Sequence, residues 1–138
     1  SQRWLFPVKL MQSQQYTAPR LALIGDAAHC CHPVAGQGMN LGIRDATALA
    51  EILVAAHQAG EDIGSEAVLK RYTNWRKPEN WAILAFTDFL DRMFSTRLLP
   101  IVMIRRMGLF LLDRIPGCKY LALRLMTGLA GKIPQVAK

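Results

Sequence analysis

The sequence predicts a mainly α-helical chain with a few strands, in which a short buried strand leads through a glycine-rich turn into a run of helices. Residues 21–24 form a continuous apolar run that stops at Gly25, a pattern typical of a strand buried on both faces in a parallel sheet. Apolar residues recur at helical spacing over residues 39–60. Further helical patterns, separated by prolines, fill the second half of the chain.

The first elements in chain order are a strand, the buried strand and a long helix. Residues 3–11 favour an edge or terminal strand, because Pro7 lacks the N–H that a central strand needs. The long helix over residues 39–60 is predicted to end at Gly60, since glycine readily adopts the left-handed conformation that terminates helices.

Four shorter helices are predicted to follow. The first begins at Ser65, whose side chain can cap it, and ends at Pro78, which cannot donate a helical hydrogen bond. The others cover about residues 79–94, 98–113 and 117–128.

Charge is distributed unevenly along the chain. Residues 1–69 contain 4 Lys or Arg and 6 Asp or Glu, a net charge of −2, whereas residues 70–138 contain 13 and 4, a net charge of +9. The second half therefore either faces an anionic partner or presents a solvated basic surface. Nucleic acid is not the expected partner, because the aromatic residues of this half recur at helical spacing, which predicts core positions for Tyr72, Trp75, Trp81, Phe86 and Phe89.

A membrane-spanning helix is not expected. The most apolar stretch, residues 98–113, is interrupted at its centre by Arg105 and Arg106. Basic residues beside large apolar ones suit a helix that lies in the membrane interface. The odd number of cysteines, 3, does not suggest a disulfide framework and favours a reducing compartment.

The run His29-Cys30-Cys31-His32 invites a metal-site interpretation, which its spacing opposes. Zinc takes four ligands in a tetrahedron, and consecutive residues of an extended chain point to opposite sides. No metal is predicted, and the cysteines are interpreted as small, half-buried apolar side chains.

The residues around this run suggest a ligand site. Asp26 follows the buried strand, where it could accept hydrogen bonds from sugar hydroxyls or only shape the turn. Gly36 and Gly38 would let the backbone approach a flat ligand. The helix that begins near Met39 and Asn40 presents unpaired N–H groups, which stabilise either a phosphate or a delocalised anion.

The stretch RLALIGDAAHCCHPVAGQGMNLGIRDATALA resembles the second FAD-binding motif of the class A flavoprotein aromatic hydroxylases, the p-hydroxybenzoate hydroxylase-like group. FPVKL, RYTNWRKPEN, TDFLDRMFS and RRMGLFLLDRIPGCK resemble the ubiquinone-biosynthesis branch, whose bacterial members act on polyprenylphenols. The resemblance implies the C-terminal part of an α/β FAD-binding fold followed by a helical region. Residues 1–20 would end the substrate-domain sheet, residues 21–60 would form the second half of the FAD-binding domain, and residues 61–138 would form the helical region.

The resemblance also implies roles for individual residues. Asp26 would bind a ribityl hydroxyl of FAD, and Pro33 would lie beside the flavin ring. Gly36 and Gly38 would let the loop pass close to that ring, and the backbone N–H groups of Met39 and Asn40 would face its pyrimidine edge. Residues given a structural role are the motif histidine, His29, and the ion-pair or packing residues Arg44 and Asp45.

The implied reaction is hydroxylation of a phenolic ring of a polyprenylated ubiquinone precursor by reduced flavin and O₂, with NAD(P)H as the reductant. The catalytic residues are not identified. The GxGxxG fingerprint of the family's first motif is absent, so the chain is expected to be part of a longer protein and inactive alone.

Expected partners are the polyprenylphenol substrate, other ubiquinone-biosynthesis proteins, further copies of the chain and, peripherally, a membrane. A cytoplasmic location, or one peripheral to a bacterial inner membrane, would follow. The alternative is a helical module that binds a membrane or a partner without flavin chemistry.

Overall fold

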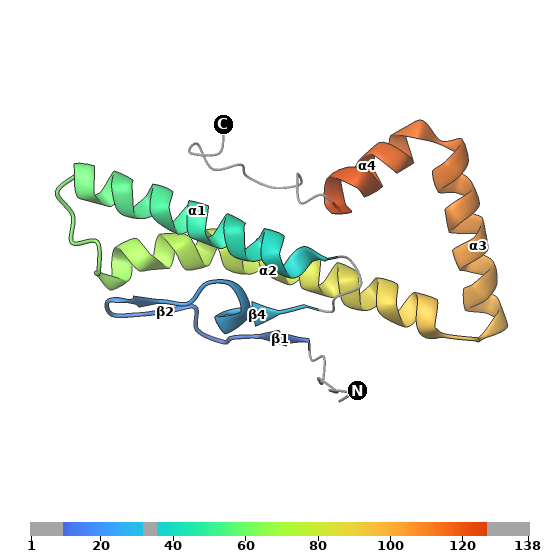
Figure 1. Ribbon diagram of the computed structural model, residues 1–138, viewed down its shortest axis with the longest axis horizontal. Coiled ribbons are helices and arrows are strands. Elements are labelled where there is room, and N and C mark those ends of the chain that lie inside the picture. The colour runs from blue at the N-terminus through green and yellow to red at the C-terminus, as the bar shows by residue number, and fades with distance from the viewer. Residues whose placement is uncertain (1–9, 32–35, 127–138) are drawn as a thin grey trace, which may run out of the picture.

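The computed structural model describes residues 10–31 and 36–126 and shows a mostly helical chain with a few short strands. Four two-residue strands and a 3-10 turn come first: β1 (Met11–Gln12), β2 (Thr17–Ala18), β3 (Leu21–Ala22), η1 (Gly25–Ala27) and β4 (His29–Cys30). The helices are α1 (Gln37–Gln58), α2 (Glu66–Ser95), α3 (Leu99–Arg114) and α4 (Pro116–Met126). Figure 1 shows α1 and α2 side by side and antiparallel, with the strands along them; α3 leads away from the end of α2, and α4 turns back from the far end of α3.

The strands form two small antiparallel pairs. β1 pairs with β4, with Met11 opposite Cys30. β2 pairs with β3 through the turn at Pro19 and Arg20, where Arg20 has a φ of 61°. Proline followed by a residue with positive φ is typical of a type II turn.

The prediction of a parallel-type strand buried on both faces at residues 21–24 is wrong in the described chain. The hairpin turn directs β3 back along β2, and Leu21 and Ile24 are 51% and 41% exposed. The strand predicted over residues 3–11 lies mostly outside the described residues; its last residue, Met11, belongs to β1.

The C-terminal end of α1 and the start of α2 follow the predicted signals. Gly60, with a φ of 71°, follows α1, and the N–H groups of Gly60 and Glu61 donate to the carbonyls of His57 and Ala56. These two bonds are those of a Schellman motif. Ser65 precedes α2, and its hydroxyl accepts a hydrogen bond from the Val68 N–H at 3.4 Å, which confirms it as the N-cap.

Pro78 does not end a helix, contrary to the prediction. α2 continues through it from Glu66 to Ser95. Arg76 and Asn80, on either side of the proline, both donate to one oxygen of the Asp45 carboxylate on α1. These buried contacts attach the residues on both sides of Pro78 to α1, which helps to offset the hydrogen bond that proline cannot make.

The core lies where the strands meet α1 and α2. Tyr16, Ala28, Ala48 and Tyr72 form its buried centre, and the Tyr72 hydroxyl donates to the Leu23 carbonyl at 2.9 Å. The predicted core positions of Trp81 and Phe89 are wrong, because these side chains are 63% and 58% exposed. The buried stripe of α2 passes through Asn80, Leu84 and Thr87 instead. Successive residues of a helix are about 100° apart around its axis, so Trp81 and Phe89 lie to the side of this stripe.

Candidate functional site

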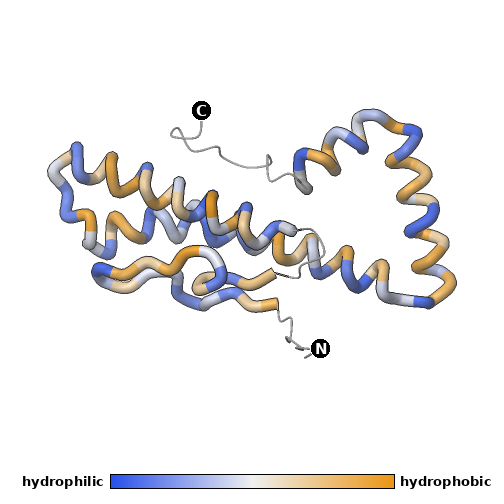
Figure 2. The backbone as a smooth tube through the Cα atoms, viewed as in Figure 1, coloured by the Kyte–Doolittle hydropathy of each residue, from blue (hydrophilic) through white to orange (hydrophobic). Residues whose placement is uncertain are grey.

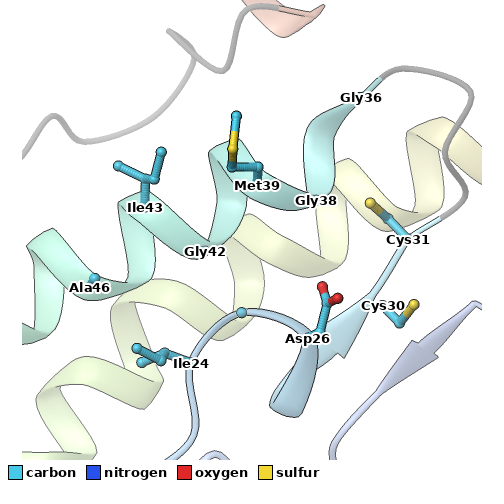
Figure 3. Close-up of a pocket in the computed structure, with 11 residues that line it drawn as sticks. Ile24, Asp26, Cys30, Cys31, Gly36, Gly38, Met39, Gly42, Ile43 and Ala46 are labelled. Carbon is cyan, nitrogen blue, oxygen red and sulfur yellow. The ribbon is translucent and has the colours of Figure 1, made fainter.

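A cavity of about 670 Å³ lies between the η1 turn, β4 and the first turns of α1. Figure 3 shows side chains from these elements around it, with the Asp26 carboxylate directed from η1 toward the first turn of α1. Its walls are mostly apolar or glycine, and they consist of Ile24, Gly25, Asp26, Cys30, Cys31, Gly36, Gly38, Met39, Gly42, Ile43 and Ala46. The cavity thus combines flat backbone walls with one carboxylate.

The structure brings four of the six predicted site residues to this cavity: Asp26, Gly36, Gly38 and Met39. Asn40 is half-buried and is not among the cavity's lining residues. Pro33 lies outside the described residues. The site therefore gathers around the η1 turn and the N-terminus of α1.

The N-terminus of α1 faces the cavity and begins at a glycine. Gly36 precedes the helix with a φ of 59° and supplies no side-chain cap, and the first turn contains no acidic residue. The first N–H groups of a helix have no partner within the helix, and the helix dipole places a partial positive charge there. This end of α1 favours a ligand atom that carries negative charge.

Glycine at position 38 keeps the cavity open. A methyl group there would lie 3.6 Å from the Cys31 sulfur and 4.0 Å from a carboxylate oxygen of Asp26. These are ordinary van der Waals distances, so the fold has room for the methyl group. The space that it would fill is the space between Asp26 and α1.

Sequence reasoning missed a second glycine contact. Gly25, with a φ of 57°, packs against Gly42, and a methyl group on Gly42 would lie 3.4 Å from the Gly25 Cα atom. This close approach lets the η1 turn lie directly on α1. The spacing of Gly38 and Gly42 could have revealed it, since residues four apart share one helix face.

Asp45 joins the turn to the helices. Its carboxylate is fully buried and accepts four hydrogen bonds. One oxygen accepts from the Gly25 N–H at 3.1 Å and from His29 Nε2 at 2.6 Å. The other accepts from Arg76 Nε at 2.8 Å and Asn80 Nδ2 at 3.0 Å. The predicted ion-pair role of Asp45 is confirmed, while its bond to the turn was not foreseen.

The charge of Asp45 is stabilised by its neighbours. Burial by itself would raise the pKa of this carboxyl, but the hydrogen bonds from His29, Asn80 and Arg76 outweigh burial and lower the pKa below its ordinary value. Arg76 is only 1% exposed and also binds the carboxylate of Glu79. The same Glu79 oxygen accepts from Arg44 at 3.1 Å. Two arginines and two carboxylates therefore form one buried to half-buried network.

The histidine of β4 and the cysteine that follows the strand, Cys31, have separate surroundings. His29 is 1% exposed and binds Asp45, and within the described chain its Nδ1 has no hydrogen-bond partner. Cys31 lines the cavity, where burial and the adjacent Cys30 raise the pKa of its thiol. Among residues 10–31 and 36–126, no three His, Cys, Asp or Glu side chains form a group that could hold a metal ion.

These features suit a flat ligand with hydroxyl groups and an electron-rich edge. Apolar walls and glycine backbone can contact the faces of a ring system. Asp26 offers an exposed acceptor for hydroxyl groups. The first turn of α1 offers N–H donors to a negatively charged edge. FAD has all three of these chemical features, so the residues present fit this cofactor.

Comparison with known proteins agrees with this geometry. Residues 1–87 match the model of a family described as FAD binding domain. The chain is 66% identical over 135 residues to protein slr1300 of Synechocystis, and the aligned residues cover 98% of this chain and 33% of slr1300. It is 46% identical over 122 residues to the ubiquinone hydroxylase UbiL of Rhodospirillum rubrum, covering 88% of this chain and 28% of UbiL.

A human relative extends the comparison. The chain is 48% identical over 107 residues to the mitochondrial ubiquinone biosynthesis monooxygenase COQ6 of Homo sapiens, covering 78% of this chain and 23% of COQ6. The chain thus spans about a quarter to a third of the length of these relatives. It is related to monooxygenases of ubiquinone biosynthesis. The matched family model covers more than half of the chain, and the chain belongs to the FAD-binding domain family.

Proposed function

We propose that this chain contributes the second half of the FAD site to a monooxygenase that hydroxylates a phenolic ring of a polyprenylated ubiquinone precursor. The observation that carries the proposal is the cavity between Asp26 and the N-terminus of α1, lined by Gly36 and Gly38. The names of UbiL and COQ6 support the substrate class. On its own, the chain is proposed to be inactive.

The residues of the chain would bind and orient the cofactor. Asp26 would accept a hydrogen bond from a ribityl hydroxyl, and Gly36 and Gly38 would allow the ring to lie against the backbone. The N–H groups of Met39 and Asn40 would face the pyrimidine edge, where the dipole of α1 favours negative charge. Pro33 is proposed to lie beside the ring.

Bound FAD would supply the redox chemistry, passing two electrons from NAD(P)H to O₂ so that one oxygen atom enters the ring and the other leaves as water. The apolar side chains of Ile24, Met39 and Ile43 would help to keep bulk water from the cavity. The division into residues 1–20, 21–60 and 61–138 remains a prediction.

We also propose that α3 and α4 make a peripheral contact with a membrane. No helix within the described residues is long and apolar enough to cross one. Figure 2 shows apolar and polar residues interleaved along α3. Leu99, Met103 and Met107 are at least 60% exposed, beside Arg105 and Arg106. Basic and large apolar side chains together suit the interface of an anionic bilayer.

Co-sedimentation of the natural gene product with liposomes tests the membrane contact. Anionic vesicles should enrich the protein at low salt and release it at high salt, because exposed charges are screened by salt. No enrichment at low salt would instead favour packing of these helices on another part of the longer protein. A membrane contact would be consistent with a location peripheral to the inner membrane of a bacterium. Other ubiquinone-biosynthesis proteins and further copies of this chain remain proposed partners.

The substitution Gly38→Ala tests the cofactor site in the natural gene product. Among the described residues the methyl group meets only ordinary contacts, and alanine stabilises helices by about 0.5–1 kcal/mol relative to glycine. We therefore expect an unchanged or higher melting temperature of the apoprotein. Because the methyl group fills the space beside Asp26, we expect FAD affinity, measured by flavin fluorescence, to fall at least about tenfold.

Gly108→Ala is the matched control. Gly108 lies in α3, and a methyl group there meets no atom of residues 10–31 or 36–126 within 4 Å. This variant should gain helix stability and keep wild-type FAD affinity. Wild-type affinity in Gly38→Ala would contradict the placement of FAD in this cavity. A natural gene product that binds no FAD would favour the alternative, a helical module without flavin chemistry.

A further inference from the structure

The Asp45 carboxylate connects the proposed cofactor cavity to a helix that does not line it. One of its oxygens accepts a hydrogen bond from the N–H of Gly25, the residue immediately before Asp26, which lines the cavity. The other is held by Arg76 and Asn80 of α2, neither of which is among the lining residues. A chain of direct hydrogen bonds therefore leads from α2 to the backbone of the η1 turn.

This connection ties the backbone next to Asp26 to α1. Gly25 adopts a positive φ of 57° and lies against Gly42, so its peptide group has one tightly defined position on α1. The bond to Asp45 locks the N–H of that peptide. Asp26 is the next residue, and a rotation of the Gly25 peptide would change where its carboxylate points.

We propose that Asp45 is a positioning residue for FAD, which aims Asp26 into the cavity and is itself held in place by Arg76 and Asn80. The proposal rests on the proposed FAD site and deepens it, since it makes α2 a part of the cofactor-binding machinery. Asp45 is not among the described residues that line the cavity. It acts through the Gly25 backbone and through its own place on α1, the helix whose N-terminus faces the cavity.

The hydrogen-bond pattern explains why a carboxylate is required. All four groups around Asp45 are donors: a backbone N–H, a histidine nitrogen, a guanidinium and an amide nitrogen. A carboxylate has only acceptors and satisfies both sides. An amide at position 45 has one acceptor oxygen and one donor nitrogen. On the side of the nitrogen, its N–H groups would therefore face groups that are donors themselves.

The substitution Asp45→Asn in the natural gene product tests the proposal. We expect FAD affinity of the folded apoprotein, measured by flavin fluorescence well below its melting temperature, to fall at least about tenfold. Faster hydrogen exchange is expected in peptides that contain Gly25. Asp62→Asn is the matched control, because Asp62 is exposed and pairs with Arg20 away from the cavity. It should leave both measurements unchanged.

The exchanged pair Asp45→Asn with Asn80→Asp separates positioning from stability. Arg76 Nη2 lies 2.6 Å from the Asn80 oxygen, so a carboxylate at position 80 would still pair with the guanidinium. The amide at position 45 could then donate to that carboxylate and accept from the Gly25 N–H, while Arg76 Nε would lose its acceptor at position 45. We expect this double variant to recover part of the melting temperature and, with it, part of the FAD affinity.

Two results would overturn the proposal: wild-type FAD affinity in folded Asp45→Asn, or an exchanged pair that recovers stability without recovering affinity. If Asp45→Asn does not fold, the exchanged pair decides. If the exchanged pair does not fold either, Asn80→Ala decides, because it removes a single donor; we then expect a few-fold loss of FAD affinity, and its absence would refute the proposal. Failure of the proposed function is distinguishable, because the wild-type protein itself would then bind no FAD.

Discussion

Replacing Arg76 with methionine should weaken the packing of α1 on α2, so that the two helices separate more often. The Arg76 guanidinium is 1% exposed and donates to Asp45 at 2.8 Å and to Asn80 at 2.6 Å. Methionine preserves much of the side-chain volume but removes the positive charge. The Asp45 carboxylate would then remain buried without its cation.

The expected cost is set by this uncompensated charge. Removing one partner of a buried ion pair typically costs about 3–5 kcal/mol, which corresponds to about two to nearly four orders of magnitude in an opening equilibrium. The cost should shrink as the pH falls from neutral. Wild-type Asp45 has a lowered pKa and contributes stability that is lost as the pH falls through that pKa. Without Arg76, burial should raise the pKa of Asp45. Protonation of Asp45 at lower pH would then remove the buried charge and reduce the loss of stability in the variant.

Hydrogen exchange of the natural gene product measures this opening directly. Peptides from α1 and α2 should lose protection in Arg76→Met by the predicted orders of magnitude, and less so at lower pH. Arg71→Met is the control on the same helix, because Arg71 pairs with Glu61 on the surface and exposed pairs contribute little. Wild-type protection in Arg76→Met, or equal losses in both variants, would refute the charge-compensation argument.

Two further predictions concern single contacts. Tyr72→Phe removes the hydrogen bond to the Leu23 carbonyl and should destabilise the same peptides by about 0.5–1.5 kcal/mol in hydrogen exchange; unchanged protection would show that this bond adds no stability. Burial and the adjacent Cys30 raise the pKa of the Cys31 thiol, so iodoacetamide should modify it more slowly than the exposed Cys118, with a rate that still rises at about pH 9. Mass spectrometry of the labelled peptides checks this, and equal rates at the two cysteines would contradict it.

Local signals predicted the elements whose ends depend on one or two residues. Ser65 caps α2 with its own hydroxyl, and Gly60 supplies the positive φ that ends α1. Such effects act within a few residues and can be read from the sequence. The short strands could not be read in this way. The hairpin of β2 and β3 depends on a positive φ at Arg20, a residue type that carries no strong signal for that conformation.

The candidate site was predictable where the motif itself forms the walls. Asp26, Gly36, Gly38 and Met39 lie within 14 residues of one another, and all four line the cavity. The support behind these walls was not predictable from local pattern. Asp45 meets Arg76 and Asn80 across 31 and 35 residues, and only the packing of α1 on α2 brings them together.

Pro78 shows how such a long-range contact can override a strong local signal. A proline in a helix interior removes a hydrogen bond and costs about 3 kcal/mol, so the sequence favours two helices that separate there. A break at this point would move Asn80 away from Arg76 and leave Asp45 without one of its donors. The buried carboxylate needs both donors. Losing one of them would destabilise the same charged group that binds the η1 turn. The bonds of Arg76 and Asn80 to Asp45 therefore favour a continuous α2 and help to offset the hydrogen bond that Pro78 cannot make.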